Sequence, residues 1–120
     1  MAQYLLSVHS VDGAEREAMT AEEMQAFMGR IGELEADMRA RDVLVYSGRL
    51  TEADVATVVE VVAGETMVTD GPFAEAKEHL GGFYIINSAD LDEALDWAAK
   101  TSTCIERPIE VRPFYDAGAA

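Results

Sequence analysis

Alternating and continuous runs of apolar residues predict six β-strands, over residues 4–9, 43–47, 57–62, 66–69, 83–87 and 109–112. In the first strand Tyr4, Leu6 and Val8 share one face, because successive side chains point to opposite sides of a strand. Gly64 lies between the third and fourth strands, a pattern that is typical of a β-hairpin. The other strands are rich in Val, Ile and Tyr, which favour a pleated, half-buried position.

Two amphipathic segments predict α-helices. The first begins at Thr20, whose hydroxyl can accept a hydrogen bond from the Glu23 amide in a capping box. Its apolar side chains recur every three or four residues and predict one core face, made of Met24, Phe27, Met28, Ile31, Leu34 and Met38. Gly29 and Gly32 each cost roughly 1 kcal/mol inside a helix, and close packing on a sheet would explain them. Asp90 caps the second helix, whose apolar face contains Leu91, Ala94, Leu95 and Ala98.

The order of these elements predicts a single domain, over residues 1–120, with an α+β fold. The order β-α-β-β-α-β is ferredoxin-like, here with an extra hairpin strand and a short helix that follows Asp70 and ends at Gly81-Gly82. Two helices can cover only one face of such a sheet. The segments that are apolar on both faces are residues 43–45, 58–62 and 83–86. A homodimer stacked sheet to sheet would cover the second face.

Charge and composition narrow the classes of partner. The net charge of −14, from 23 acids and 9 bases, repels phosphate backbones and disfavours both nucleic acid and anionic membranes. No apolar segment approaches the roughly 20 residues of a membrane span, and no leader pattern begins the chain. With Cys104 as the single cysteine, these features predict a cytoplasmic protein. Because metal-ligand and nucleotide-phosphate motifs are absent, we expect no metal site and no cofactor.

The segment around Asp70 is similar to a known family. The matching residues are Val68-Thr69-Asp70-Gly71-Pro72-Phe73-Ala74-Glu75, Lys77-Glu78 and Leu80-Gly81-Gly82-Phe83-Tyr84, and they resemble the DGPF group of the YCII-related proteins. Residues 90–95 and 109–113 resemble the second helix and the last strand of that family. The resemblance implies a dimeric α+β barrel of ferredoxin-like subunits. It also implies enzyme-like proteins of unsettled reaction, some fused to, or encoded beside, extracytoplasmic-function sigma factors.

Asp70 is the first candidate for catalysis. Pro72 can occupy the first position of a helical turn, which would place the Asp70 carboxylate near free amides. One interpretation is a structural cap or Asx turn, and the alternative is a general base or ligand anchor at a pocket mouth. His9 could pair with Asp70 as an acid–base dyad, or it could be a hydrogen-bonded histidine of the sheet.

Four further side chains are candidates for ligand binding. Lys77 could bind a carboxylate or phosphate, and Glu78 could supply a second carboxylate, although both residues also suit a solvated helix face. Ser47 and Arg49 lie at the end of the second strand, a common position for ligand contacts.

Two functional hypotheses follow. The first is a small enzyme-like protein that binds a small organic molecule in a cleft between sheet and helices, with Asp70 as base or anchor. The second is a non-catalytic ligand-binding or regulatory module associated with a sigma factor, because an acidic surface suits a protein partner better than nucleic acid.

Overall fold

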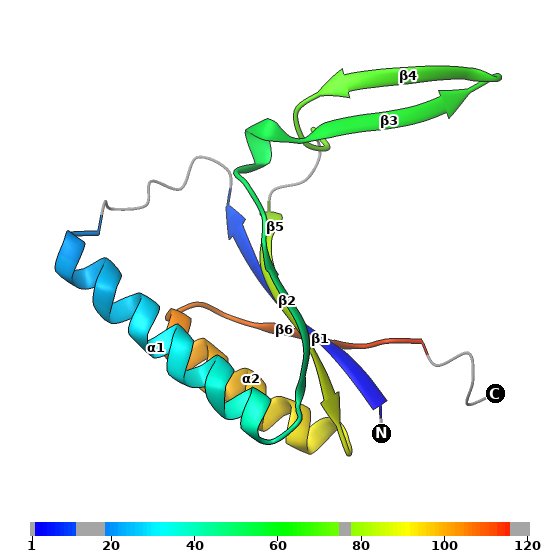
Figure 1. Cartoon of the computed structure of the whole chain (residues 1–120). Coiled ribbons are helices and arrows are strands. Elements are labelled where there is room, and N and C mark those ends of the chain that lie inside the picture. The colour runs from blue at the N-terminus through cyan, green and yellow to red at the C-terminus, as the bar shows by residue number, and fades with distance from the viewer. Residues whose placement is uncertain (1, 12–18, 75–77, 116–120) are drawn as a thin grey trace.

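The computed structural model describes residues 2–11, 19–74 and 78–115. These residues form a mixed α+β structure of two α-helices and six antiparallel strands in two sheets (Figure 1). In chain order the elements are β1 (Ala2–Val11), α1 (Ala21–Ala40), β2 (Leu44–Arg49), the 3-10 helix η1 (Ala53–Val55), β3 (Thr57–Val62), β4 (Glu65–Asp70), β5 (Glu78–Ser88), α2 (Leu91–Ile105) and β6 (Glu110–Pro113). The six predicted strands and the two long predicted helices are confirmed, with ends that differ by a few residues.

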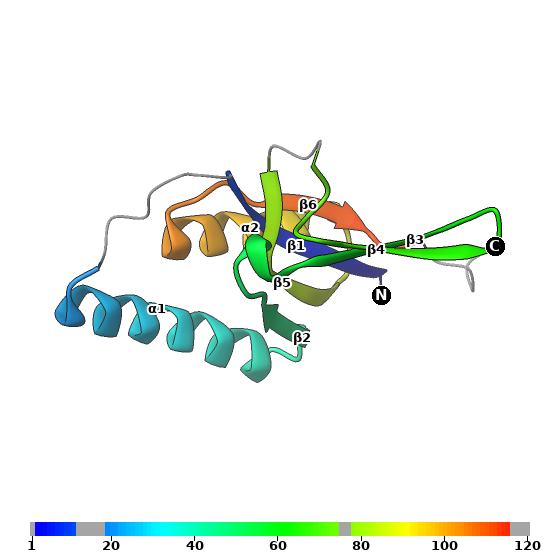
Figure 2. The same cartoon turned by 90° about the horizontal axis from the view of Figure 1, so that it is seen from above.

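The main sheet has the strand order β2-β5-β1-β6, and each neighbouring pair is antiparallel. The two helices lie on one face of this sheet (Figure 1 and Figure 2). Alternate side chains of β1 and β5 point toward the helices and meet them in the core, which consists of Tyr4, Leu6, Leu34, Met38, Val43, Tyr84, Ile86, Ala94, Trp97, Ala98 and Cys104. Burial of this apolar surface is the main stabilising contribution to the fold.

Both predicted helix caps are confirmed. Thr20 Oγ1 accepts a hydrogen bond from the Glu23 amide at 3.1 Å, and Asp90 Oδ1 accepts one from the Glu93 amide at 2.9 Å. In α2 the Glu93 carboxylate also accepts a hydrogen bond from the Ala89 amide at 3.0 Å, which completes a capping box. Because the first amides of a helix have no partner within the helix, these side chains fix where α1 and α2 begin.

The N-terminal half of α1 is not buried, so the prediction of one continuous core face is wrong for this half. Met38 is fully buried, but Met24 and Met28 are exposed. A β-carbon added to Gly29 or Gly32 would have no atom within 4 Å, and close packing on the sheet therefore does not explain these glycines. In Figure 2 this half of α1 extends beyond the strands of the main sheet.

Replacing both Gly29 and Gly32 with alanine is expected to raise the free energy of unfolding by about 1–2 kcal/mol. Alanine is favoured over glycine inside a helix by about 0.5–1 kcal/mol per site, and no neighbouring atom opposes the added methyl groups. Urea denaturation followed by circular dichroism measures the change. An unchanged or lower free energy of unfolding would mean that something outside this subunit packs against these positions in solution.

The strands β3 and β4 form a separate two-stranded sheet (Figure 1). Their turn consists of Ala63 and Gly64, with φ of 51° and 81°. Positive φ at both central residues is what a type I′ hairpin turn requires. The predicted hairpin is confirmed, but residues 58–62 do not belong to the buried sheet in which we expected them.

The predicted short helix after Asp70 lies partly outside the described residues, and the described residues from Glu78 onward form a strand, so no helix ends at Gly81-Gly82. Gly71 has a φ of 97°, which favours glycine, and its amide donates a hydrogen bond to the Ala56 carbonyl at 2.7 Å. This bond closes the base of the hairpin. Strand β5 has already begun before Gly81 and Gly82, because pairing with β1 and β2 supplies backbone hydrogen bonds that outweigh the low strand preference of glycine.

Candidate functional site

A cleft of about 330 Å³ opens between α1 and the main sheet. It is lined by Leu6, Val8, Phe27, Met28, Ile31, Glu35, Ser47, Gly48, Arg49, Gly81, Gly82, Phe83, Tyr84 and Ile105. Most of these side chains are apolar, and a few polar groups stand among them. A largely apolar hollow with a small number of polar groups is the usual form of a small-molecule site.

The cleft exists because both of its walls lack bulk. On the sheet side, Gly82 occupies a position that faces the helices, since it pairs with Arg49. A β-carbon on Gly82 would lie 3.2 Å from the carbonyl oxygen of Gly48, so β2 and β5 approach each other closely here. On the helix side, the N-terminal half of α1 does not reach the sheet, as the exposure of Met28 shows.

Glu35 and Tyr84 form a polar contact in the wall of the cleft. The Tyr84 hydroxyl donates a hydrogen bond to Glu35 Oε2 at 2.9 Å, and Arg39 Nη2 lies 3.4 Å from Glu35 Oε1. Burial raises the pKa of Tyr84, and the hydrogen bond and negative charge of Glu35 raise it further. Tyr84 therefore stays protonated at neutral pH and holds the Glu35 carboxylate in one orientation.

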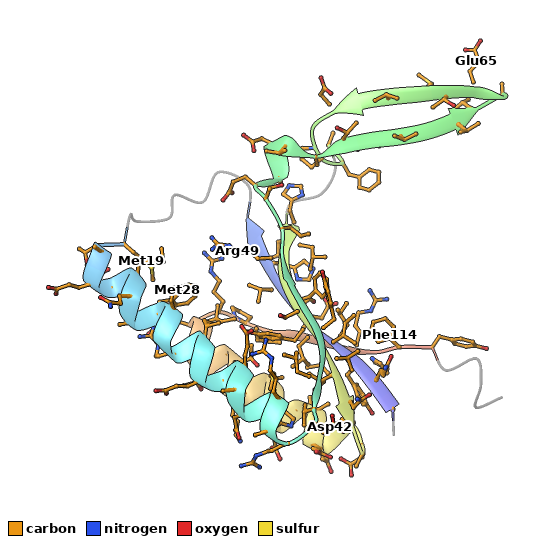
Figure 3. All side chains as sticks on the ribbon, viewed as in Figure 1. Met19, Met28, Asp42, Arg49, Glu65 and Phe114 are labelled. Carbon is orange, nitrogen blue, oxygen red and sulfur yellow. The ribbon has the colours of Figure 1, made fainter. Side chains whose placement is uncertain are left out.

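Arg49 supplies the positive charge of the cleft. Arg49 pairs with Gly82 across the sheet and Ser47 pairs with Tyr84, so Ser47 and Arg49 lie on the strand face that looks toward the helices. Among the described residues no carboxylate lies within ion-pair distance of Arg49. Figure 3 shows the Arg49 side chain extending from β2 toward the N-terminal half of α1, on the side of Met28. A guanidinium in this setting is available to a ligand.

The other predicted site residues lie elsewhere. Asp70 is exposed at the end of β4, and Glu78 is exposed at the start of β5. His9 is partly buried on β1 and pairs with Leu80, just after an irregularity in the register. None of these three lines the cleft, and Lys77 lies outside the described residues. The structure thus brings two of the predicted residues together, and the roles of the other four stay predictions.

A second hollow, of about 390 Å³, lies at the base of the β3–β4 hairpin. Its lining includes Glu52, Pro72, an exposed Phe73 and His79. The part of its lining that the structure describes contains no arginine or lysine. The cleft beside α1 therefore offers the more complete chemistry, because it combines a carboxylate, a hydroxyl and a guanidinium.

Sequence reasoning missed Glu35 and Tyr84. Glu35 could have been found, since it lies four residues after Ile31 and seven after Met28, within the apolar stripe of α1. A carboxylate in that position requires a polar partner. Tyr84 looked like an ordinary member of an apolar strand, and 49 residues separate it from the carboxylate that it contacts.

The described residues contain no group of three or more His, Cys, Asp and Glu side chains that could hold a metal ion. No helix among them is long and apolar enough to cross a membrane. The single cysteine, Cys104, is buried, and this burial raises the pKa of its thiol. Because the thiolate is the nucleophilic form, Cys104 is unreactive.

Two comparisons relate the chain to known proteins. The YCII-related domain family matches residues 2–116, which include every strand, both helices and the whole lining of the cleft. A protein of Rhizobium meliloti (strain 1021) that is described as uncharacterised is 51% identical over 67 residues. That match covers 54% of this chain and 54% of the relative, so the chain spans about half the length of the curated relative.

Proposed function

Because the chain belongs to the YCII-related domain family, whose match includes the whole cleft, we propose that it binds a small organic molecule between α1 and the main sheet. The observation that carries this proposal is Arg49, a guanidinium beside apolar walls with no ion pair among the described residues. A guanidinium binds a carboxylate or phosphate through two parallel hydrogen bonds. The proposed ligand therefore carries an anionic group, which Ser47 can help to bind.

The other walls of the cleft describe the rest of this ligand. Phe27, Met28 and Ile31 form an apolar wall, which suits an aliphatic or aromatic body. Glu35 accepts hydrogen bonds from Tyr84 and Arg39, and a carboxylate has about four lone-pair sites. It can therefore accept a further hydrogen bond from a hydroxyl or amine of the ligand. An amphipathic organic acid meets all three conditions, because it can combine an anionic group for Arg49, an apolar body and a hydroxyl or amine for Glu35.

Any proton transfer in this cleft would use Glu35 as the base. Tyr84 suits the role of a hydrogen-bond donor, because its raised pKa keeps the phenol neutral. Asp70, with His9 as its partner, is the base that the sequence suggests, and it lies outside the cleft. The carboxylate-binding assay described below compares variants of Arg49 in the cleft and of Asp70, and therefore distinguishes the two positions.

We also propose a ferredoxin-like subunit that pairs sheet to sheet with a second copy. The strand order β2-β5-β1-β6, with both helices on one face, supports the first part. The face without helices supports the sheet-to-sheet pairing, because it exposes apolar side chains. Leu5, Phe83 and Ile85 on this face are only partly buried, and Tyr46 is 59% exposed. Light scattering at micromolar concentration tests the dimer, and a monomeric mass would contradict it.

Replacing Arg49 with alanine is expected to weaken the binding of a small carboxylate by roughly 10- to 100-fold, since a hydrogen bond to a charged group contributes about 1.5–3 kcal/mol. The probe is a panel of aliphatic and aromatic monocarboxylates, screened by thermal shift on the wild-type protein and then titrated by calorimetry. Arg49→Lys should retain part of the affinity, because an ammonium keeps the charge but loses the planar fork.

Arg41→Ala is the matched control, because Arg41 forms an ion pair with Asp37 at the C-terminal end of α1 and does not line the cleft. This variant should leave the dissociation constant unchanged. If Asp70→Asn abolished binding and Arg49→Ala did not, the site would lie at Asp70 instead. If no carboxylate stabilised the wild-type protein, the proposed ligand class would be wrong.

A further inference from the structure

The β3–β4 hairpin, residues 57–70, projects from the rest of the molecule, and we call it the hairpin arm. Figure 1 shows that it leaves the main sheet at its base and extends away from it. Every residue of β4 is exposed, and so is every residue of β3 except Val58. An isolated two-stranded hairpin is marginally stable at best in water. The hairpin arm therefore needs a surface to pack against.

The two faces of the hairpin arm differ in charge. Val59, Val61 and Val68 share one face, and their side chains are 61–66% exposed. We call this the apolar face of the arm. The opposite face carries the acids Glu60 and Glu65 together with Val58, Val62 and Met67. Figure 3 shows Glu65 pointing away from the main sheet. The two acids Glu60 and Glu65 therefore lie on one face of the arm, whereas the apolar face has a single acid, Asp70, at the base of the arm.

The main sheet also has an uncovered face, on the side opposite the helices, which we call the outer face. Its centre is apolar and includes Phe83, whose ring lies 6.0 Å from that of Tyr46. Its margin on β6 carries one charge of each sign, Glu110 and Arg112, which pair with Ser7 and Leu5 across the sheet. An apolar centre within a polar rim is the usual anatomy of a protein interface.

The chain exposes more surface than a monomer of its mass needs to expose. Its accessible surface is 8836 Å², whereas a compact monomer of 13.0 kDa exposes about 6,300 Å². Its radius of gyration is 17.0 Å, compared with about 13.6 Å for a compact domain of this length. The excess is roughly 2,500 Å² per subunit and about 5,000 Å² for a pair, which is at the upper end of the total area that obligate dimers bury.

We propose that the apolar face of the hairpin arm packs against the main sheet of a second copy, so that each subunit clasps the other. The proposal rests on the sheet-to-sheet dimer proposed above and assigns the arm a place in it. The hairpin arm leaves the main sheet at its base, so the arm and the main sheet form two sides of one concave corner on the side away from the helices (Figure 1). In a two-fold pair each corner receives the partner, because such an interface uses the same surface on both subunits.

The charges on these surfaces favour a second copy over another class of partner. A chain with a net charge of −14 would attract a basic protein, but the apolar face of the arm carries Val59, Val61 and Val68 with only one acid, Asp70, at its base. The outer face carries Glu110 and Arg112 together. A two-fold axis can place each of these charges opposite its complement on the other subunit, so a copy of this chain meets no excess of like charge.

Two adjacent valines of β3 test the proposal. Val61 and Val62 lie on opposite faces of the hairpin arm and are 66% and 47% exposed. Val61→Glu is expected to raise the dimer dissociation constant at least roughly 100-fold, because the symmetric interface contains the substitution twice. Val62→Glu adds the same side chain to the same strand and should leave the constant unchanged. Sedimentation velocity over a range of concentrations measures both.

Hydrogen exchange tests the hairpin arm in the wild-type protein, without any substitution. Amides of residues 57–70 should be protected above the dissociation constant and should exchange freely after dilution below it. A wild-type chain that is monomeric at every concentration overturns both the dimer and the clasp. A dimer in which these amides exchange freely, or in which the Val61 and Val62 variants behave alike, overturns the clasp alone. Carboxylate binding at Arg49 is measured separately and is unaffected by either result.

Discussion

Replacing Ile86 with alanine is expected to lower the free energy of unfolding by about 2–5 kcal/mol. Ile86 is fully buried in the core between the main sheet and the helices. Truncation removes buried apolar atoms and leaves a cavity that close-packed neighbours fill only in part. The melting temperature should fall by roughly 10–25 °C. Thermal and urea unfolding, followed by circular dichroism, measure the two quantities.

Ile85→Ala is the control, because Ile85 precedes Ile86 on β5 and points to the outer face. The same atoms are removed from a partly exposed position, so the loss within one subunit should stay well below 2 kcal/mol. In a dimer the melting temperature rises with protein concentration, and Ile85→Ala should reduce that rise. Equal, concentration-independent losses in both variants would contradict the proposed difference between the two faces.

Above pH 10 the stability of the protein is expected to fall by up to about 1.4 kcal/mol per pH unit because of Tyr84 alone. The phenol of an unfolded chain titrates near pH 10, whereas burial and the neighbouring Glu35 raise the pKa of Tyr84 in the folded protein. The folded protein keeps a proton that the unfolded chain has released. The contribution of Tyr84 is therefore fully present below pH 10 and is lost as the pH rises toward the folded pKa.

The comparison of Tyr84→Phe with wild type isolates this effect from other groups that titrate at high pH. The variant should lose the Tyr84 part of the slope, so the difference in free energy of unfolding between the two proteins should change by about 2 kcal/mol from pH 10 to pH 12. Tyr115→Phe is the control, because Tyr115 is almost fully exposed, and it should keep the wild-type slope. An unchanged slope in Tyr84→Phe would mean that the phenol ionises equally well in both states.

Features set by neighbouring residues could be predicted from the sequence. The caps at Thr20 and Asp90 involve amides three residues away, and the hairpin turn involves only Gly64 and its neighbours. Features set by contacts between distant residues could not be predicted from the sequence. The glycines at 81 and 82 looked like the end of a helix, but pairing with β1 and β2 makes them part of a strand. The exposure of Met28 likewise depends on where α1 meets the sheet, which periodicity does not reveal.

Part of the candidate site could likewise be predicted from the sequence, and part of it could not. Ser47 and Arg49 could be predicted because the end of a strand is a local feature. Their relation to Glu35 depends on the packing of α1 against β5, which brings together residues far apart in the chain. Asp70 stood out through its turn motif, and the structure accounts for part of that motif through the positive φ of Gly71. A conspicuous motif can therefore mark a turn that the backbone requires, while the polar groups of a cleft are dispersed along the sequence.

The central position of β1 in the main sheet constrains how the chain is synthesised. β1 leaves the ribosome well before both of its neighbours, β5 and β6, because these strands come much later in the chain. At about 5–20 residues per second, the end of β5 follows the end of β1 by roughly 4–15 s. Long-range pairing of this kind also slows folding. A nascent chain that ends before Glu78 lacks both neighbours of β1, so the backbone groups of β1 have no sheet partner during that interval.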